Sequence, residues 1–106
     1  MKDRRSDCPL SCALELVGDR WTLLVLRDLM RGRERFRDLL AAPEGISTNI
    51  LTTRLKKLVD AGLVTREGRR YALTAKGRDM RPVILALARW SEQHVPGTSG
   101  VPAAWK

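Results

Sequence analysis

The segment GISTNILTTRLKKLVDAGLV, residues 45–64, limits the possible folds more than any other part of the chain. Its leucines, isoleucines and valines recur at helical spacing and fall on one broad arc, as in a helix that packs on a core. The opposite arc carries polar side chains with no acidic one among them: Asn49, Thr52, Thr53 and Lys56. Threonine and asparagine are weaker helix formers than the Glu and Lys of ordinary solvated faces. Two interpretations stay open: a plain solvated face, and a face of short side chains that reaches the floor of a DNA groove.

The charge balance favours an anionic partner. The 106 residues are enough for one compact domain, and 20 Lys and Arg against 12 Asp and Glu give a formal net charge of +8. Such an excess indicates nucleic acid first and an acidic membrane second. The most apolar run, residues 21–30, is interrupted by Arg27 and Asp28 and is too short to span a bilayer. The start, MKDRRSDCPL, lacks the apolar stretch of a signal peptide, so we expect a cytoplasmic protein without membrane contact.

Capping signals predict the helices of the first half of the chain. Pro9 suits a first helical turn, Gly18 suits a stop, and Asp19 and Ser47 are N-cap candidates. The helices are expected over residues 8–18, 20–32 and 34–43, and from residue 48 onward.

In the second half of the chain, the spacing of the apolar residues changes from that of a helix to that of strands. Residues 63–74, LVTREGRRYALT, carry β-branched and aromatic residues on both sides of Glu67-Gly68, which predicts a tight hairpin with these two residues as its turn. Thr74 then caps one long helix that is kinked at Pro82. Residues 96–106 have no periodicity and are expected to be a flexible tail, as residues 1–7 are expected to be a basic arm.

This order of elements is that of a winged helix-turn-helix. A helix, the turn APEGIS and a second helix make the helix-turn-helix, and a hairpin with Arg66, Arg69 and Arg70 about its turn follows in the position of a wing. Residues 31–57 have seven basic and three acidic side chains, and residues 66–81 have six and two. We therefore expect a mainly α fold with a small β-hairpin, residues 8–95, that binds double-stranded DNA.

Candidate contacts follow from side-chain chemistry. Short polar groups on the second helix suit the reading of base edges, whereas cations and helix N-termini suit phosphate contacts. The candidates for base readout are Thr48, Asn49, Thr52, Thr53 and Lys56. The candidates for phosphate contact are Arg20, Arg35, Arg37, Ser47, Lys57, Arg66, Arg69 and Arg70. Arg54 lies among the core-facing residues, and we expect it to pair with an acidic residue such as Asp38 or Glu34.

Several motifs together resemble the HxlR type of winged helix-turn-helix regulators, which are bacterial relatives of the MarR-like repressors. They are Cys-Pro, Gly-x-x-Trp-Thr, Arg-Phe-x-x-Leu, Gly-Ile-Ser, Leu-Thr-x-Arg-Leu and Gly-Leu-Val-x-Arg, spread from Cys8 to about Val95. The resemblance implies a homodimeric transcription factor that binds an inverted repeat and dimerises through its first and last helices. The wing is shorter here than is usual in the family, so we expect Arg69 and Arg70 to contact phosphates rather than bases.

The last helix has an apolar face that either packs on its own domain or forms a dimer seam. With the first helix it gives the expected interface: Cys8, Leu10, Met80, Val83, Ile84, Leu87 and Trp90. Cys8 itself has two readings. It is a small apolar group of that interface, or it is a redox or electrophile sensor, as some members of the resembling family have a reactive cysteine at the Cys-Pro position.

Other functions find less support. His94 has no second histidine or suitable cysteine near it, so no metal and no cofactor are expected. There is no Ser-His-Asp set, glycine-rich phosphate loop or pair of carboxylates, so an enzyme is not expected. We expect a transcriptional regulator, and a repressor rather than an activator. Its effector, a small molecule or a redox agent, is not identified by the sequence. The alternative is a winged-helix module that binds proteins without sequence-specific DNA binding.

Overall fold

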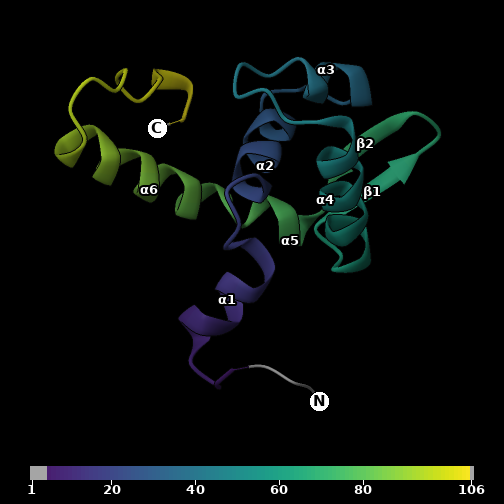
Figure 1. The fold of residues 1–106 in the computed structure, drawn as a ribbon, viewed down its shortest axis with the longest axis horizontal. Coiled ribbons are helices and arrows are strands. Elements are labelled where there is room, and N and C mark those ends of the chain that lie inside the picture. Colours follow the sequence, from purple (N-terminus) through teal and green to yellow (C-terminus); the bar gives the residue numbers. More distant parts are fainter. Residues whose placement is uncertain (1–4, 106) are drawn as a thin grey trace.

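The computed structural model describes residues 5–105 and is the predicted mainly helical fold with one antiparallel hairpin (Figure 1). The first four residues of the expected basic arm lie outside this range. The helices and strands, in chain order, are α1 (Pro9–Val17), α2 (Thr22–Met30), α3 (Phe36–Leu40), α4 (Thr48–Asp60), β1 (Val64–Glu67), β2 (Arg70–Leu73), α5 (Ala75–Arg78), α6 (Arg81–His94) and the 3-10 turn η1 (Ala103–Trp105). Within the described chain, no helix combines the length and the apolar character that crossing a bilayer requires.

The core lies between α2, α4 and the hairpin. Leu26, Leu51 and Leu58 have no exposed surface, and Leu63 and Val64 carry the same core to the start of β1. Most of the apolar arc predicted on residues 45–64 is thus the buried side of α4, whereas Val59, which the arc includes, is exposed. This burial fixes which side of α4 turns outward.

Side-chain caps set the helix starts much as the sequence indicates. The Ser47 hydroxyl accepts a hydrogen bond from the Ile50 N–H at 3.2 Å, and the Thr74 hydroxyl accepts one from the Gly77 N–H at 3.1 Å. The Asp19 carboxylate accepts from the N–H groups of Trp21 and Thr22, at 2.8 and 2.9 Å. It therefore does cap the second helix, but α2 begins at Thr22 rather than directly after Asp19.

The hairpin turn lies one residue later than predicted. Glu67 pairs with Arg70, so the two turn residues are Gly68 and Arg69 rather than Glu67 and Gly68. Gly68 has a φ of +62°, whereas Arg69 has a negative φ. A two-residue turn of this kind needs glycine at its first central position, which is what places Gly68 there and Glu67 in the strand.

The single long helix expected after Thr74 is two helices. The N–H groups of Asp79 and Met80 bond back to the carbonyls of Ala75 and Gly77, which closes α5. Pro82 then stands in the first turn of α6, where its missing N–H costs nothing. Proline therefore starts a new helix here instead of kinking an old one.

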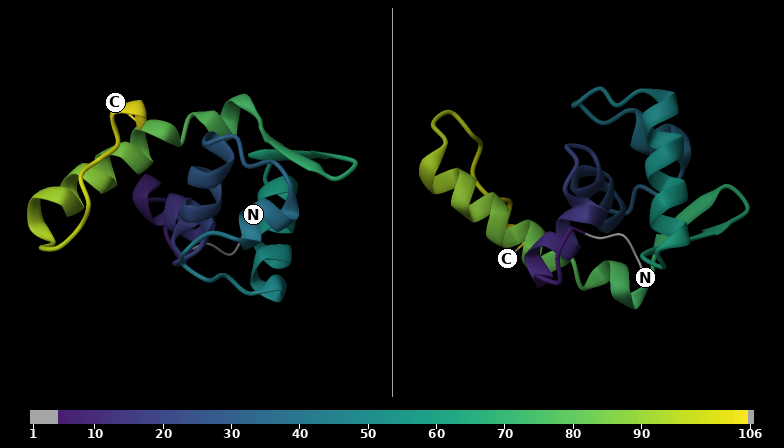
Figure 2. Two further views of the ribbon diagram at one scale, coloured as in Figure 1. Left: turned by 90° about the horizontal axis from the view of Figure 1, so that it is seen from above. Right: turned by 60° about the horizontal axis from the view of Figure 1, so that its bottom comes forward.

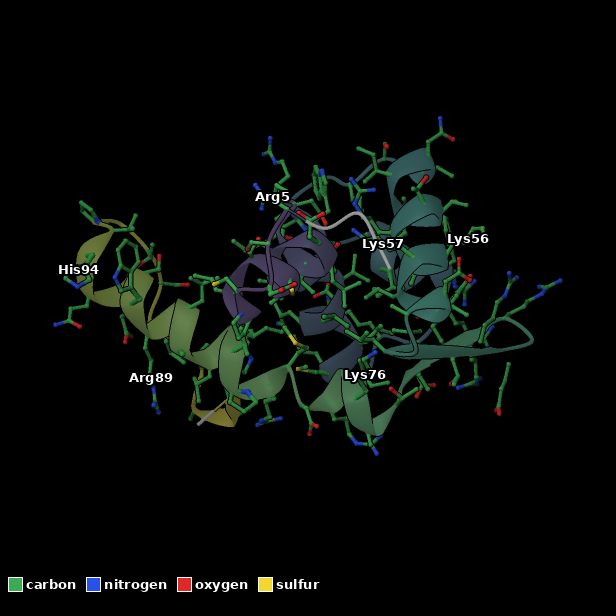
Figure 3. All side chains as sticks on the ribbon, turned by 90° about the horizontal axis from the view of Figure 1, so that it is seen from below. Arg5, Lys56, Lys57, Lys76, Arg89 and His94 are labelled. Carbon is green, nitrogen blue, oxygen red and sulfur yellow. The ribbon has the colours of Figure 1, made fainter. Side chains whose placement is uncertain are left out.

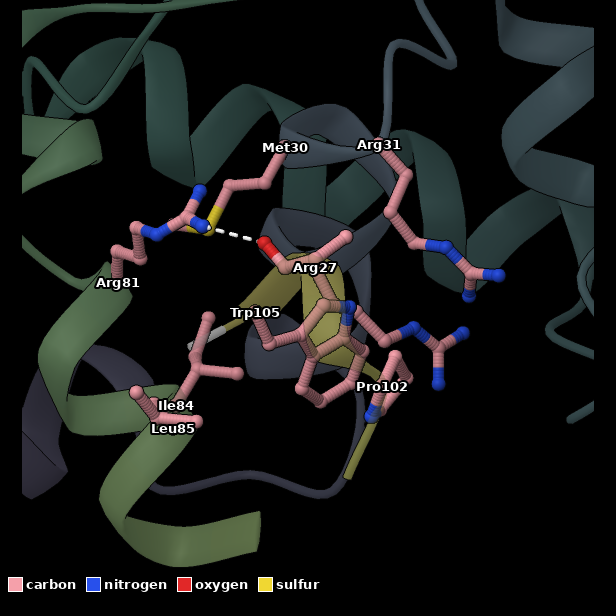
Figure 4. A pocket seen from close by; sticks show the side chains of 9 residues that line it. Arg27, Met30, Arg31, Arg81, Ile84, Leu85, Pro102 and Trp105 are labelled. Atoms are coloured by element: carbon pink, nitrogen blue, oxygen red, sulfur yellow. Dashed lines mark hydrogen bonds between the residues drawn. The ribbon is translucent and has the colours of Figure 1, made fainter. Parts of the chain in front are cut away.

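Helix α6 projects from the rest of the molecule, and none of its residues is buried in the described chain (Figures 1 and 2). Residues 96–105, expected as a flexible tail, fold back along it. The Val101 N–H donates to the Glu92 carboxylate at 2.9 Å, and the Arg81 guanidinium donates to the Ala104 carbonyl at 2.7 Å (Figure 4). Trp105 thereby becomes one wall of a cavity of about 330 Å³ between this segment, α2 and α6.

Candidate nucleic-acid interface

The outward face of α4 carries the predicted base-reading residues together. The side chains of this face are all exposed: Thr48, Asn49, Thr52, Thr53 and Lys56. The two threonines bond to their own helix. The Thr52 hydroxyl donates to the Thr48 carbonyl at 2.8 Å, and the Thr53 hydroxyl donates to the Asn49 carbonyl at 2.9 Å. Lys56 pairs with Asp60 at 3.0 Å, a pair exposed enough to open readily.

Four of the predicted phosphate-contacting arginines line one hollow. Arg35 and Arg37, at the start of α3, face Arg66 and Arg69 of the hairpin across a space of about 330 Å³. Phe36 and Tyr71 complete the described lining, and no Asp or Glu is among these residues. A concentration of guanidinium groups without a carboxylate suits an anion, and the forked donors of arginine match phosphate oxygens.

A second hollow joins α4 to the hairpin. The hairpin lines it with Arg66 and Tyr71, and α3 with Phe36. The α4 residues that line it are Thr52, Lys56, Val59 and Asp60. Arg66 borders both hollows, and its guanidinium lies 5.5 Å from the centre of the Tyr71 ring. The α4 face, the arginine hollow and the hairpin therefore form one continuous surface, which we call the α4–hairpin surface.

Arg70 differs from the other hairpin arginines because it has a carboxylate partner. Its guanidinium lies 2.7 Å from the Glu34 carboxylate, and the Tyr71 N–H donates to the Glu34 carbonyl at 2.8 Å. These bonds attach the hairpin to the segment before α3. They also neutralise one of the cations predicted to contact phosphate.

Three further predicted phosphate contacts have other partners. Lys57 is half-buried, and its ammonium group donates to the Glu15 carbonyl at the end of α1, at 3.0 Å, whereas Lys56 extends outward from α4 (Figure 3). Arg20 is exposed, and its guanidinium lies 5.2 Å from the centre of the ring of Trp21, which packs partly buried against the core. The hydroxyl of Ser47 serves as the cap of α4.

Arg54 forms the expected structural ion pair, but with a different partner. Its guanidinium lies 3.0 Å from the Asp19 carboxylate, and among the described residues it forms no ion pair with Asp38 or Glu34. Partial burial alone would raise the pKa of the Asp19 carboxyl group. The hydrogen bonds from Thr22, from the backbone N–H groups and from Arg54 outweigh burial and lower that pKa far below its usual range. The sequence shows Asp19 as a cap, but nothing in it indicates that the same carboxylate also holds α4.

The turn between α3 and α4 is attached to α2. Arg27 of α2 donates to the Glu44 carboxylate with both terminal nitrogens, at 2.9 and 2.8 Å, and these bonds lower the pKa of the Glu44 carboxyl group. Arg27 also bonds to the buried Asp28. A bidentate pair of this kind is geometrically specific, so it fixes the position of this turn relative to α2.

A second, apolar surface lies on α1 and α6. Leu10 is 67% exposed, Leu87 54% and Trp90 58%, and Val83 is also exposed. Cys8, just before α1, is exposed too. Met80 and Ile84, predicted with this group, are instead partly buried against the core of their own domain.

No metal site is found among residues 5–105, because no three His, Cys, Asp or Glu side chains come together there. The ring of His94 lies beside Trp90, with 5.0 Å between the ring centres.

The profile of the HxlR-like helix-turn-helix family matches residues 16–99, which is most of the chain. The chain belongs to this family. The uncharacterized HTH-type transcriptional regulator Rv3095 of Mycobacterium tuberculosis is 42% identical over 97 residues, which cover 85% of this chain. The chain spans only 61% of the length of that relative. Because the family and its relatives are transcriptional regulators, the expectation that the chain is not an enzyme is confirmed.

Solved structures of HxlR-like and redox regulators share the fold. Quinone-bound YodB of Bacillus subtilis is 34% identical, with a TM-score of 0.73 over 81% of this chain and 99% of YodB. The redox regulator HypR in its oxidized form is 28% identical, with a TM-score of 0.74 over 82% of this chain and 97% of HypR. These likenesses confirm the winged-helix architecture predicted from the sequence.

Proposed function

We propose that the chain forms a homodimer that binds an inverted-repeat operator and represses transcription. Each subunit places the outward face of α4 in a major groove and lays the α4–hairpin surface along the adjoining phosphates. The observation that carries this proposal is the hollow in which Arg35, Arg37, Arg66 and Arg69 converge beside α4. A bound dimer would exclude other proteins from the operator, which is the simplest route to repression.

The dimer is inferred from the apolar surface of α1 and α6. None of the 14 residues of α6 is buried, and Ile84 packs only in part against the core, so the helix gains little stability from its own subunit; large exposed apolar patches are rare on monomers. Val83, Leu87 and Trp90 are spaced so that they share one side of α6. A second copy that packs on these residues and on Leu10 would bury them around a twofold axis.

Most of the affinity in this proposal comes from phosphates. Arginines that replace condensed counterions make binding steeply salt-dependent, with about one unit of slope for each phosphate contacted. The α4 face supplies the preference for sequence, with Asn49 suited to adenine and Thr48, Thr52 and Thr53 to neighbouring base edges.

An electrophoretic shift on genomic fragments in moderate salt tests the proposal. Arg66→Ala should weaken binding to all sequences and flatten the salt dependence. Arg89→Ala, which removes an exposed cation from α6 on the far side from α4, serves as the charge-matched control and should leave both unchanged (Figure 3). Equal losses for the two variants would show that net charge alone attracts the DNA.

Sedimentation of the same protein tests the dimer. A single monomeric species at micromolar concentration would refute it. A dimer that shifts no fragment at any salt concentration would point to the alternative, a winged-helix module that binds another protein.

We also propose that Cys8 makes the regulator responsive to oxidants or electrophiles. The Cys8 thiol is exposed just before α1, and Leu10 in the first turn of that helix is exposed too. Oxidation of the thiol would therefore alter the proposed dimer interface. HypR and YodB, described above as a redox regulator and a quinone-bound regulator, give this proposal its support.

The test of this second proposal compares two cysteines. Diamide, which takes two electrons and two protons from the Cys8 thiols of two subunits as they form a disulfide and is itself reduced to the hydrazine, should change the DNA affinity of the native protein. Cys12→Ser should respond as the native protein does, whereas Cys8→Ser should not respond. A full response in Cys8→Ser would remove the proposed role of that thiol.

A further inference from the structure

The two threonines in the middle of α4 do not have free hydroxyl groups. The Thr52 and Thr53 hydroxyls both donate to carbonyls one turn earlier, at 2.8 and 2.9 Å. Each hydroxyl carries a single proton, so neither threonine can donate a hydrogen bond to a base while these bonds hold. Their oxygens keep only the capacity to accept.

The same bonds decide what these side chains present outward. With Oγ1 turned back to the helix backbone, the Cγ2 methyl group is the part of each exposed threonine that faces away from it. Two adjacent β-branched residues with fixed side-chain angles therefore make a small rigid apolar patch. This patch lies within an otherwise polar face, between Asn49 and Lys56.

In the major groove, methyl groups occur at one place. Thymine carries a methyl at C5, and the other unmodified bases show only donors and acceptors on that side. A methyl group packed against a methyl group is a contact that discriminates thymine from cytosine without a hydrogen bond.

We propose that Thr52 and Thr53 recognise the C5-methyl groups of pyrimidines, which are thymines in unmodified DNA. This inference rests on the proposed DNA binding and specifies which base the α4 face selects. Each half-site then contains at least one thymine whose methyl group, rather than its hydrogen-bonding edge, is read. Asn49, one turn before Thr53, is placed to read an adjacent adenine.

Thymine replaced by uracil keeps every base-pair hydrogen bond and loses only the methyl group, which makes it the matched probe. The duplex used is one that the native protein selects from a random-sequence pool. Deoxyuridine replaces each thymine of that duplex in turn. Loss of one methyl contact should weaken binding about fourfold, the factor that burial of one methylene-sized group gives.

Two substitutions on the protein separate the methyl group from the hydroxyl. Thr52→Val and Thr53→Val keep the outward methyl, because valine in its preferred helical rotamer places its two methyl groups where threonine holds Oγ1 and Cγ2. Thr52→Ser and Thr53→Ser keep the hydroxyl and lose the methyl. Thr98→Ser, in the exposed segment after α6 and outside the α4–hairpin surface, is the control, and thermal unfolding checks that every variant folds.

For the native protein and the valine variants, deoxyuridine at one or two positions of each half-site should weaken DNA binding about fourfold. For at least one serine variant, the same replacement should leave the binding affinity unchanged. A penalty that survives both serine variants, or that disappears in both valine variants, would overturn the inference. So would native protein that binds its selected duplex equally well with uracil at every position. Failure to select any DNA is a different outcome, because it overturns the proposed function together with the inference.

Discussion

Asp19 is the residue whose removal tests the architecture most directly. Its carboxylate caps α2 through the N–H groups of Trp21 and Thr22, and it also holds the Arg54 guanidinium of α4. Asp19→Ala removes both functions. Asp19→Asn keeps an oxygen that can accept from the N–H groups and removes the charge that Arg54 pairs with.

The two losses can be estimated separately. An N-cap changed to alanine costs about 1 kcal/mol. A hydrogen bond to a charged group contributes about 1.5 to 3 kcal/mol, and the lower end applies here because the Asp19 and Arg54 side chains are 24% and 26% exposed. We therefore expect Asp19→Ala to lower the free energy of unfolding by about 2.5 kcal/mol and Asp19→Asn by about 1.5 kcal/mol. In a domain of this size the first corresponds to a fall in Tm of about 10 °C.

The contribution of the Asp19 charge to the free energy of unfolding should also depend on pH. The Asp19 pKa is lower in the folded than in the unfolded chain, so the folded state favours the carboxylate. The stability that this gives is fully present above the unfolded pKa of about 3.9 and is lost as the pH falls below that value toward the depressed folded pKa. The native protein and Asp19→Asn should therefore differ most near neutral pH and converge in acid.

Urea unfolding of the native protein and both variants at neutral and acidic pH measures these differences. Arg54→Met serves as the reciprocal control, because it removes the cation and leaves the cap in place. If Asp19→Asn were as stable as the native protein at neutral pH, or if its deficit stayed constant into acid, the assignment of an ion pair between Asp19 and Arg54 would be wrong.

Three further predictions follow from other parts of the structure. Gly77→Ala should cost about 2 kcal/mol or more in thermal unfolding, because a Cβ there would lie 2.1 Å from the Leu63 carbonyl oxygen. Gly100→Ala, whose Cβ would lie 3.3 Å from the end of the Glu92 side chain, should cost little. Leu87→Glu should raise the dimer dissociation constant at least tenfold in sedimentation, because it places a charge in the proposed seam, while Thr65→Glu should not; a dimer that withstands the change would have to form elsewhere. Arg69→Ala should reduce the slope of log affinity against log salt by about one, and Arg70→Ala by less because Glu34 already pairs with Arg70; the reverse order would contradict the placement of the hairpin arginines.

Features that depend on near neighbours could be predicted from the sequence. The caps at Ser47 and Thr74, the stop at Gly18 and the two arcs of α4 all arise from residues within one or two turns of each other. The base-reading candidates follow from those arcs, and the structure brings them onto one exposed face.

Features that depend on distant residues could not be predicted. Arg54 pairs with Asp19, which is 35 residues away, and Lys57 bonds to a backbone carbonyl, a partner that leaves no mark in a sequence. The shifted hairpin turn and the break before α6 have another cause. Gly68 can occupy either central position of a two-residue turn, and the pairing of the strands selects the first. Pro82 can kink a helix or begin one, and here it begins α6.

The bonds of Lys57 to the Glu15 carbonyl and of Arg54 to Asp19 join α4 to the end of α1 and to the loop that follows it. In a dimer assembled through α1, the gap between the two α4 helices would then be set by the subunits and would adjust little to the DNA. One base pair added between half-sites turns the second site by about 34° around the duplex, given about 10.5 base pairs per turn. Operators with altered spacers should consequently be poor targets even when both half-sites are intact.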